Sequence, residues 1–350
     1  MLSIPLGSQV VLQHTANGHA IAGALVKTQV VRVTAPARLH LGFLDLNGGL
    51  GRKFGGIGLA LAEPQTRLTL KFSEHGRTQV TGSQANRAEN YLTKMAASLQ
   101  LEGAYALHVE EALPAHAGLG SGTQMALSVA QALRRLHHLP LNAAEDAMVL
   151  ERGARSGLGA AFFRTGGLLV DGGRGPDTRL PPIIAAQDFP SDWRVILVLD
   201  HGSTGVHGAK EIAAFATLPR FPESAAQTIC RLTLMQLLPA LAEQDIAAFG
   251  SAVFDIQRLA GAYFAPAQGG VFASARVAQT MGRLDALGAF GSGQSSWGPT
   301  GFAFAPSQKI AQNWVDTLLR ESHAENLEIR IVSGRSSGAS VETLPQLTPA

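Results

Sequence analysis

Hydrophobic and polar side chains alternate with period two along several short stretches of the chain, which is the pattern of a half-buried β-strand. Between Trp193 and Leu199 nearly every position is apolar, as expected for a strand that is buried on both faces. The predicted strands are residues 31–34, 67–72, 105–110, 168–170, 193–199, 302–304 and 327–331. The chain after Ser333 is rich in serine and glycine, and we expect this tail to be mobile.

Other stretches repeat their apolar residues every three or four positions, which predicts amphipathic helices. The predicted helices are residues 88–101, 125–136, 142–152, 222–243, 245–260 and 310–318. Asn142 is placed to cap one of them, with Glu145 as its capping-box partner. Within the helix over 222–243, an apolar residue at every third position predicts a face turned to the core. These residues are Leu232, Met235, Leu238 and Leu241.

Length and composition indicate a globular protein of two domains. The chain has 350 residues, of which 46% are hydrophobic and 15% are charged, and this is enough for a sizeable core. We place the domain boundary in the stretch 172–192, which is rich in glycine, proline and aspartate. The expected organisation is an N-terminal extension at 1–30, an N-terminal domain at 31–185 and a C-terminal domain at 186–340.

Charge, cysteine content and hydropathy exclude several classes of protein. A net charge of +2 creates no field that would attract nucleic acid or an anionic membrane. Cys230 is the single cysteine, so an internal disulfide is impossible, and its apolar helical setting predicts a buried thiol. No apolar run reaches the length of a membrane span, and residues 1–30 lack the pattern of a signal peptide. We therefore expect a cytoplasmic protein.

A glycine-rich stretch, residues 113–124, lies between a predicted strand and the first turn of a predicted helix. Glycine allows positive φ and close approach of a ligand to the main chain, and N–H groups of a first helical turn have no intrahelical partner. Together with the helix dipole, these features suit phosphate or pyrophosphate, and Ser121 and Thr123 add hydroxyl donors. The alternative is a plain turn with an N-cap. The stretch has neither the lysine of a Walker loop nor the spacing of a Rossmann fingerprint.

A glycine-dense stretch nearer the N-terminus, residues 45–58, follows the strand that carries Arg38 and His40. One interpretation is a hairpin with bulges. The other is a substrate-facing loop, in which Arg38 and His40 project toward an anion and Arg52 or Lys53 closes over it.

A third glycine-rich stretch, residues 291–301, places Trp297 between two serines and a Gly-Pro pair, which is unusual for a simple turn. His201 and His207 lie in the loop after the buried strand, but as a metal pair they lack an evident third ligand. Ser156 and Asp171 either face a site or serve as cap and turn residues.

In chain order, the stretch at 45–58 with the strand before it, the stretch at 113–124 and the stretch at 291–301 are called the first, second and third loops below. In this order they resemble the three motifs of the galactokinase, homoserine, mevalonate and phosphomevalonate (GHMP) kinase superfamily. The matching motifs are Pro36-x-Arg38-x-x-x-Gly42, Pro114-x-x-x-Gly118-Leu119-Gly120-Ser121-Gly122 and Gly298-Pro299-Thr300. Within the superfamily the chain is most similar to the β-ribofuranosylaminobenzene 5′-phosphate synthase family of methanopterin biosynthesis, over about residues 31–335. The closer similarity lies in Arg38-Leu39-His40-Leu41-Gly42-Phe43, in Gly118 to Thr123, in Gly166-Gly167 with Asp171-Gly172-Gly173, and above all in Gly293-Gln294-Ser295-Ser296-Trp297-Gly298-Pro299-Thr300.

The resemblance implies a two-domain α+β fold of the GHMP kinase type. It also implies an enzyme that joins phosphoribosyl pyrophosphate to 4-aminobenzoate or 4-hydroxybenzoate and releases carbon dioxide and pyrophosphate. Its product would enter tetrahydromethanopterin synthesis, which serves one-carbon metabolism. Mg²⁺ is expected with the pyrophosphate. We expect a homodimer, with no nucleic acid and no membrane as partner.

The residues can be assigned roles in this reaction, because departure of pyrophosphate leaves positive charge at ribose C1. The pyrophosphate is expected on Gly118, Leu119, Gly120, Ser121, Gly122 and Thr123, with Ser121 as a candidate magnesium ligand. Substrate binding is expected of Gln294, Ser295, Ser296, Trp297, Gly298 and Thr300, with the indole stacked on the aromatic acid. The catalytic candidates are Arg38, which can pair with a phosphate or carboxylate, and His40, Asp45 and His201 as alternative general bases.

Two other functions stay open. One is an ATP-dependent small-molecule kinase of the same fold. Many kinases of the superfamily carry an aspartate in a Ser-Gly-x-Asp context, whereas the stretch from Ser156 to Ala161 has no carboxylate. The other is a ligand-binding relative without catalytic activity.

Overall fold

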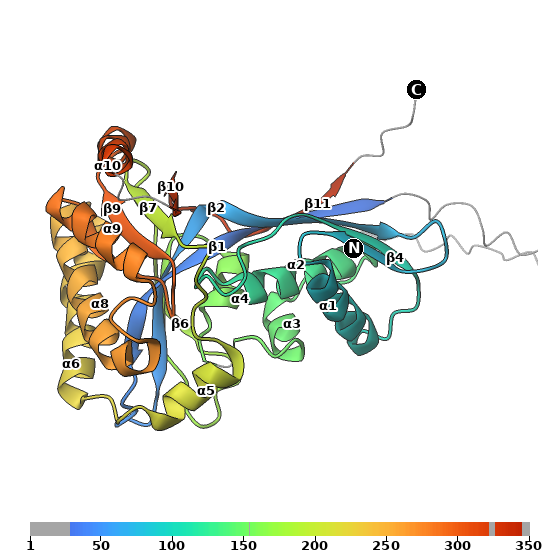
Figure 1. The fold of residues 1–350 in the computed structure, drawn as a ribbon. Helices are drawn as coiled ribbons and strands as arrows, with labels where there is room; N and C mark the ends of the chain where they lie inside the picture. The colour runs from blue at the N-terminus through green and yellow to red at the C-terminus, as the bar shows by residue number, and fades with distance from the viewer. Residues whose placement is uncertain (1–28, 154, 322–325, 345–350) are drawn as a thin grey trace, which may run out of the picture.

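The computed structural model describes residues 29–153, 155–321 and 326–344, which form two β-sheets with helices packed against them (Figure 1). The first sheet consists of β1 (Val30–Asp45), β2 (Phe54–Phe72), β3 (Gln79–Gly82), β4 (Tyr105–Glu111), β5 (Leu168–Asp171), β6 (Ile183–Gln187) and β11 (Ser340–Leu344). Its main order is β11-β1-β2-β4-β3, while β5 pairs with the first part of β2 and with β6. The mixed content of helix and sheet confirms the predicted α+β class.

The hairpin of β1 and β2 is the longest feature of the fold and contributes to two hydrophobic cores (Figure 1). In its first part, Val31 and Val33 pack under the helices α1 (Ala85–Ser98) and α2 (Ser121–Leu136). The register shifts between Pro36 and Ala37, and beyond this point Leu39 and Leu41 belong to the other core. This hairpin therefore carries Arg38 and His40 to the place where the two cores meet.

The short helices α3 (Ala143–Val149) and α4 (Leu158–Arg164) complete the layer over the first sheet. The predicted N-cap is confirmed, because the Asn142 side chain accepts from the Glu145 main-chain N–H at 3.2 Å. The Glu145 carboxylate, however, accepts from the Asn142 side-chain amide and not from its main chain. The helix ends at Val149, three residues before the predicted end, because Glu151 adopts positive φ.

The second sheet has the order β10-β7-β9-β8 and is covered on both faces. Its strands are β7 (Arg194–Leu199), β8 (Phe290–Gln294), β9 (Gly301–Ala305) and β10 (Glu328–Val332). One face packs on α9 (Ala275–Ala286) and α10 (Gln308–Arg320), with Ile196 and Val198 in that core. The opposite face, with Val195 and Leu197, packs toward α8 (Ile246–Gln268). This arrangement confirms the strand buried on both faces that the apolar run predicts.

The predicted helix over 222–243 is interrupted by a π-helical turn. The stretch is divided into α6 (Glu223–Leu232), the π-helical turn η1 (Thr233–Leu237) and α7 (Leu238–Glu243). The apolar stripe is only partly correct, because Leu238 and Leu241 are buried while Met235 is 73% exposed. A π-turn adds a residue to the turn and so rotates the face that follows it. The Cys230 thiol is half-buried, with its Sγ 3.8 Å from the Leu44 carbonyl oxygen.

Two expectations about irregular segments are wrong. The tail after Ser333 is not free up to residue 344, because β11 pairs antiparallel with the edge of β1. Glycine and serine composition does not show such a long-range partner. The loop before β2 belongs to the hairpin and does not close over the cavity described below, because Arg52 donates to the carbonyl oxygens of Gly172 and Gly173 at 2.8 Å.

The boundary near residue 185 stays a prediction. One core combines β1 residues such as Leu39 with Trp193 and Phe249 from beyond that boundary. The extension at 1–30 lies outside the described residues apart from its last two positions. Among the described helices, none combines the length and apolar character that crossing a membrane requires.

Candidate active site

The second glycine-rich stretch ends at the N-terminus of α2, as predicted. Gly118 and Gly120 both have a φ of 79°, a left-handed conformation that favours glycine. A Cβ on Gly118 would overlap the main-chain oxygen of Ser295, so this glycine lets the second and third loops touch. A Cβ on Gly120 would lie 3.3 Å from the Cβ of Arg38. Gly120 is also the N-cap of α2, and no side chain caps the first turn.

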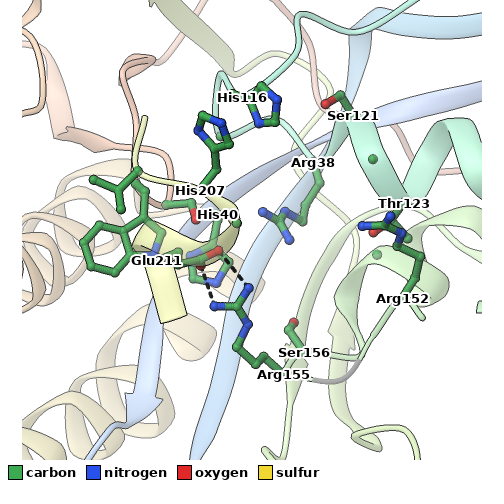
Figure 2. A pocket seen from close by; sticks show the side chains of 18 of the residues that line it. Arg38, His40, His116, Ser121, Thr123, Arg152, Arg155, Ser156, His207 and Glu211 are labelled. Carbon is green, nitrogen blue, oxygen red and sulfur yellow. Dashed lines mark hydrogen bonds and ion pairs between the residues drawn. The ribbon is translucent and has the colours of Figure 1, made fainter. Parts of the chain in front are cut away.

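A cavity of about 540 Å³ opens in front of this turn (Figure 2). The second loop, β1, the third loop and the start of α5 (Gly208–Thr217) all contribute to its lining. Its charged and titratable side chains are Arg38, Arg87, Arg152, Arg155, Glu151, Glu211, His40, His116 and His207. Four arginines against two carboxylates make the cavity suited to an anionic ligand.

Two arginines converge on the start of α2. A Cβ on Gly122 would lie 2.7 Å from Nη2 of Arg87 and 3.5 Å from Nη1 of Arg152. Arg152 donates through Nη2 to the Tyr91 hydroxyl at 2.9 Å, while its buried Nε has no partner among the described residues. Guanidinium groups beside free main-chain N–H groups form a strong site for phosphate oxygens. Neither arginine is among the predicted site residues.

Arg38 lies between this basic end and the rest of the cavity (Figure 2). Its main-chain N–H donates to the Leu119 carbonyl oxygen at 3.0 Å, which ties β1 to the second loop. Its Nε is buried and has no hydrogen-bond partner among the described residues. Burial lowers the pKa of Arg38 to about 10, opposed by the charges of Glu211 and Asp171. The guanidinium is therefore charged at neutral pH and available to a ligand.

His40 is two residues further along β1 and lies on the same face as Arg38, because side chains alternate along a strand. The residue is only 3% exposed, yet it lines the cavity. Burial, and then the charge of Arg38, lower the pKa of His40 well below its usual value. The imidazole is therefore neutral at physiological pH.

Aromatic side chains line the cavity beside His40, which Figure 2 shows on the other side of Arg38 from Ser121 and Thr123. Phe43 packs on His40 with ring centroids 4.6 Å apart. Trp297 packs between Phe264, at 4.4 Å, and Phe215, at 5.5 Å. Trp297 is 5% exposed, and its buried Nε1 has no acceptor among the described residues. The cavity thus has one basic end and one aromatic end, with Arg38 between them.

The third loop reaches the cavity with only half of its predicted residues, which are Ser296, Trp297 and Gly298. Ser295 is fully buried, where its hydroxyl accepts from the His40 N–H at 3.0 Å and donates to the Gly118 carbonyl at 2.9 Å. It joins all three loops and is not free for a ligand. Gln294 and Thr300 are also buried and do not line this cavity, and Gln294 accepts from the Ala273 N–H at 2.7 Å.

Two of the catalytic candidates lie elsewhere, so we do not retain them. Asp45 accepts from the main-chain N–H groups of Asn47 and Gly48 and closes a turn. His201 pairs with Glu328 at 2.6 Å at the surface. Neither residue lines the cavity. The described residues also contain no cluster of three His, Cys, Asp or Glu side chains that could hold a metal ion.

The cavity also contains paired groups that the sequence analysis did not assign to it. His116 and His207 stack with centroids 3.6 Å apart, and their loops are joined by the Gly205 N–H, which donates to the His116 carbonyl at 3.2 Å. Arg155 and Glu211 form an ion pair at 2.6 Å, drawn in Figure 2. Arg155 directly precedes Ser156, a candidate site residue, and His116 lies within the glycine-rich stretch 113–124. Their closeness in sequence to these motifs was the one feature from which they could have been predicted.

Two segments of the chain match models of known protein families. The GHMP kinases N terminal domain matches residues 86–167, and the GHMP kinases C terminal domain matches residues 237–324. A beta-ribofuranosylphenol 5′-phosphate synthase of Archaeoglobus fulgidus is 34% identical over 333 residues, which is 89% of this chain and 100% of the relative. An enzyme of the same name from Methanothermobacter thermautotrophicus is 32% identical over 76% of this chain and 86% of its own.

The fold is also found among solved structures. The homoserine kinase of Cytophaga hutchinsonii superimposes with a TM-score of 0.65 over 94% of this chain and 100% of that chain, at 16% identity. At this identity the similarity concerns the fold alone, and it confirms the GHMP kinase-like architecture.

Proposed function

The chain belongs to the family of the β-ribofuranosylphenol 5′-phosphate synthases, with the GHMP kinase fold, and from this premise we propose the reaction that it catalyses. The protein transfers the phosphoribosyl group of phosphoribosyl pyrophosphate to the ring carbon of 4-hydroxybenzoate or 4-aminobenzoate that bears the carboxylate. Carbon dioxide and pyrophosphate leave. The observation that carries this proposal is the buried Arg38 guanidinium, whose Nε has no partner among the described residues, between a basic and an aromatic end of one cavity. The place of the product in methanopterin synthesis, the homodimer and the cytoplasmic location belong to the same proposal.

The basic end suits the donor, which carries a pyrophosphate and a 5′-phosphate. Main-chain N–H groups of the first turn of α2, with Arg87 and Arg152 beside them, bind phosphate oxygens. Breaking the bond from C1 to pyrophosphate places negative charge on the leaving group. Arg38 stabilises this charge, because a preorganised donor in a buried site needs no reorganisation as the charge develops.

The aromatic end suits the acceptor, which is a flat ring. Phe43 and Trp297 provide apolar surface on which such a ring can pack close to Arg38. The attacking atom is a ring carbon, so the protein needs to position the ring and needs no serine or cysteine nucleophile. Holding the ring carbon against C1 converts an encounter of two substrates into a reaction within one complex.

Magnesium fits this site only as a partner of the donor. Mg²⁺ usually keeps several waters and binds through one or two protein oxygens together with substrate phosphates. Ser121 and Thr123 line the basic end, and their hydroxyl oxygens would hold it there. When bound, the ion neutralises charge on the pyrophosphate.

A kinase of the same fold is the alternative, and the surroundings of Ser156 argue against it. The nearest carboxylate there is Asp171, which accepts from the Ser156 hydroxyl at 2.6 Å and from the Gly157 and Gly173 N–H groups. Asp171 is fully buried and does not line the cavity. It is therefore engaged in structure and is not placed to activate a substrate hydroxyl.

The test is to incubate the protein with phosphoribosyl pyrophosphate, Mg²⁺ and carboxyl-labelled 4-hydroxybenzoate or 4-aminobenzoate. We expect labelled carbon dioxide and pyrophosphate in equal amounts. ATP hydrolysis that depends on a small alcohol, without such release, would establish the kinase. Stoichiometric binding without turnover would identify a ligand-binding relative.

The matched variants are Arg38→Met and Arg164→Met. Arg164 is an exposed arginine of α4 that does not line the cavity. Loss of a preorganised donor to a developing charge reduces kcat by about 100- to 1000-fold, and we expect this for Arg38→Met only. Equal activity of the two variants would remove Arg38 from the mechanism.

A further inference from the structure

His40 has the properties of a base within the cavity and not of a ligand to an anion. It is buried and lines the cavity, and among the described residues its hydrogen bond is made by its main-chain N–H, which donates to the Ser295 hydroxyl. Its ring nitrogens are not closed off from the cavity, so a ligand bound there can reach them. An imidazole that is neutral offers one N–H and one acceptor nitrogen.

The position of His40 fits the acceptor more than the donor. Phe43 packs on one side of its ring. A smaller cavity of about 30 Å³ continues behind it, lined by His40, Phe43 and Ser296 together with Phe264 and Gln294. His40 therefore lies where the aromatic end extends inward. Along β1 the Cα atoms of Arg38 and His40 are separated by about 6.7 Å, so the two side chains address different parts of one ligand.

From this placement we infer that His40 is a catalytic residue that accepts the proton of the para hydroxyl group of the acceptor. The inference rests on the proposed function and adds the route of a proton to it. The acceptor then lies with its carboxylate end toward Arg38 and C1 of the ribose, and with its hydroxyl on His40. Protonated histidine beside Arg38 is unfavourable, so the base returns the proton before the products leave.

The hydroxyl proton passes to His40, and the released electron pair makes the ring carbon that bears the carboxylate more nucleophilic. This carbon bonds to ribose C1 as the bond from C1 to pyrophosphate breaks, with its electron pair leaving on the pyrophosphate. The carboxylate then leaves as carbon dioxide, and the electron pair of that bond restores the aromatic ring. The oxygen regains the proton from His40.

An acceptor with an amino group in place of the hydroxyl does not need a base. The lone pair of a neutral aromatic amine already donates to the ring, so attack by 4-aminobenzoate needs no deprotonation in advance. A protein that lacks the base should therefore lose activity with the phenol-type acid and keep most of it with the amine.

The experiment compares wild type, His40→Asn and His40→Phe with both acids. His40→Asn keeps a hydrogen-bonding side chain and His40→Phe keeps a ring against Phe43, and neither accepts a proton. General-base catalysis contributes about 100-fold or more, so we expect kcat with 4-hydroxybenzoate to fall by about this factor in both variants. With 4-aminobenzoate we expect kcat to fall by about fivefold or less, because attack by the amine does not depend on the base.

A pH series adds a readout that a structural role would not change. The activity of His40→Asn with 4-hydroxybenzoate should rise steeply with pH as the solvent supplies the phenolate, whereas wild type should show no such rise. Equal loss with both acids and no recovery at high pH would overturn the role of His40. If wild type binds phosphoribosyl pyrophosphate but turns over neither acid, the proposed function itself fails, and the role of His40 fails with it.

Discussion

The second and third glycine-rich loops look alike in sequence but have different tasks in the structure. Gly120 to Thr123 open onto the cavity at the start of α2. The third loop instead buries Gln294, Ser295 and Thr300 and presents only three of its predicted residues. A loop of small residues can bind a ligand or can let two segments of chain approach each other, and the partner of each residue decides which.

Gly118 and Gly120 show the same contrast within one loop. Both have a φ of 79°, but Gly118 faces the main chain of Ser295, whereas Gly120 faces the side chain of Arg38. Substitution at Gly118 should therefore damage folding, and substitution at Gly120 should mainly damage binding. The following predictions test this division, beginning with the largest effect.

Gly118→Val should destabilise the protein by about 4 kcal/mol or more, because left-handed strain adds to overlap with a main-chain atom that cannot move away. The measurement is the free energy of unfolding in urea. Gly269→Val is the control, since Gly269 has a φ of 83° and nothing within 4 Å of an added Cβ. Equal destabilisation of the two variants would show that contact with the third loop contributes nothing.

Trp297→Ala should destabilise the protein by about 3–5 kcal/mol, because a buried indole is removed from between Phe264 and Phe215. It should also weaken binding of the aromatic acid more than binding of phosphoribosyl pyrophosphate. Calorimetric titration with each ligand measures this, and Trp297→Phe is the conservative control. Equal weakening of both ligands would mean that the indole only packs.

Gly120→Val should destabilise the protein by about 1–3 kcal/mol through left-handed strain, less than Gly118→Val, because its added Cβ meets a side chain and not the main chain. It should weaken binding of phosphoribosyl pyrophosphate by about 10- to 100-fold, the loss of one charge-assisted main-chain hydrogen bond. Binding of the aromatic acid should change little. Unchanged affinity for phosphoribosyl pyrophosphate in this variant would mean that the loop is only a turn and does not bind the donor.

The smallest effect concerns pH. His40 is neutral in the folded state because its pKa is lowered, so the unfolded chain binds the proton more readily at acid pH. The free energy of unfolding should therefore fall as the pH drops below about 6.5, by at most about 1.4 kcal/mol per pH unit for this residue. His40→Phe should show a shallower fall in urea titrations between pH 7.5 and 5. If the free energy of unfolding depends on pH equally in both proteins, the His40 imidazole is solvated and its pKa is not lowered by burial.

The fold was predictable where the pattern is local. The strand and helix on either side of the second loop, the cap at Asn142 and the doubly buried β7 all follow from periodicity over a few residues. The pairing of β11 and the exposure of Met235 were not predictable, because one needs a distant partner strand and the other a π-turn.

The site was predictable only in its main-chain part. Glycines at a helix start and the alternation of Arg38 and His40 on one strand were sufficient for those positions. Arg87 comes from α1 and Arg152 from the segment after α3, and they meet α2 only in three dimensions, so no spacing reveals them. Ser295 matched a motif, but its role as a link between three loops depends on contacts 177 and 255 residues apart in sequence.

The most direct test of the central claim is a crystal structure of the protein with phosphoribosyl pyrophosphate bound. We predict that phosphate oxygens lie within hydrogen-bond distance of the main-chain N–H groups at the start of α2 and of the Arg38 guanidinium, with the ribose directed toward His40 and Trp297. A donor bound outside this cavity, with the first turn of α2 and Arg38 making no contact with phosphate, would contradict the account.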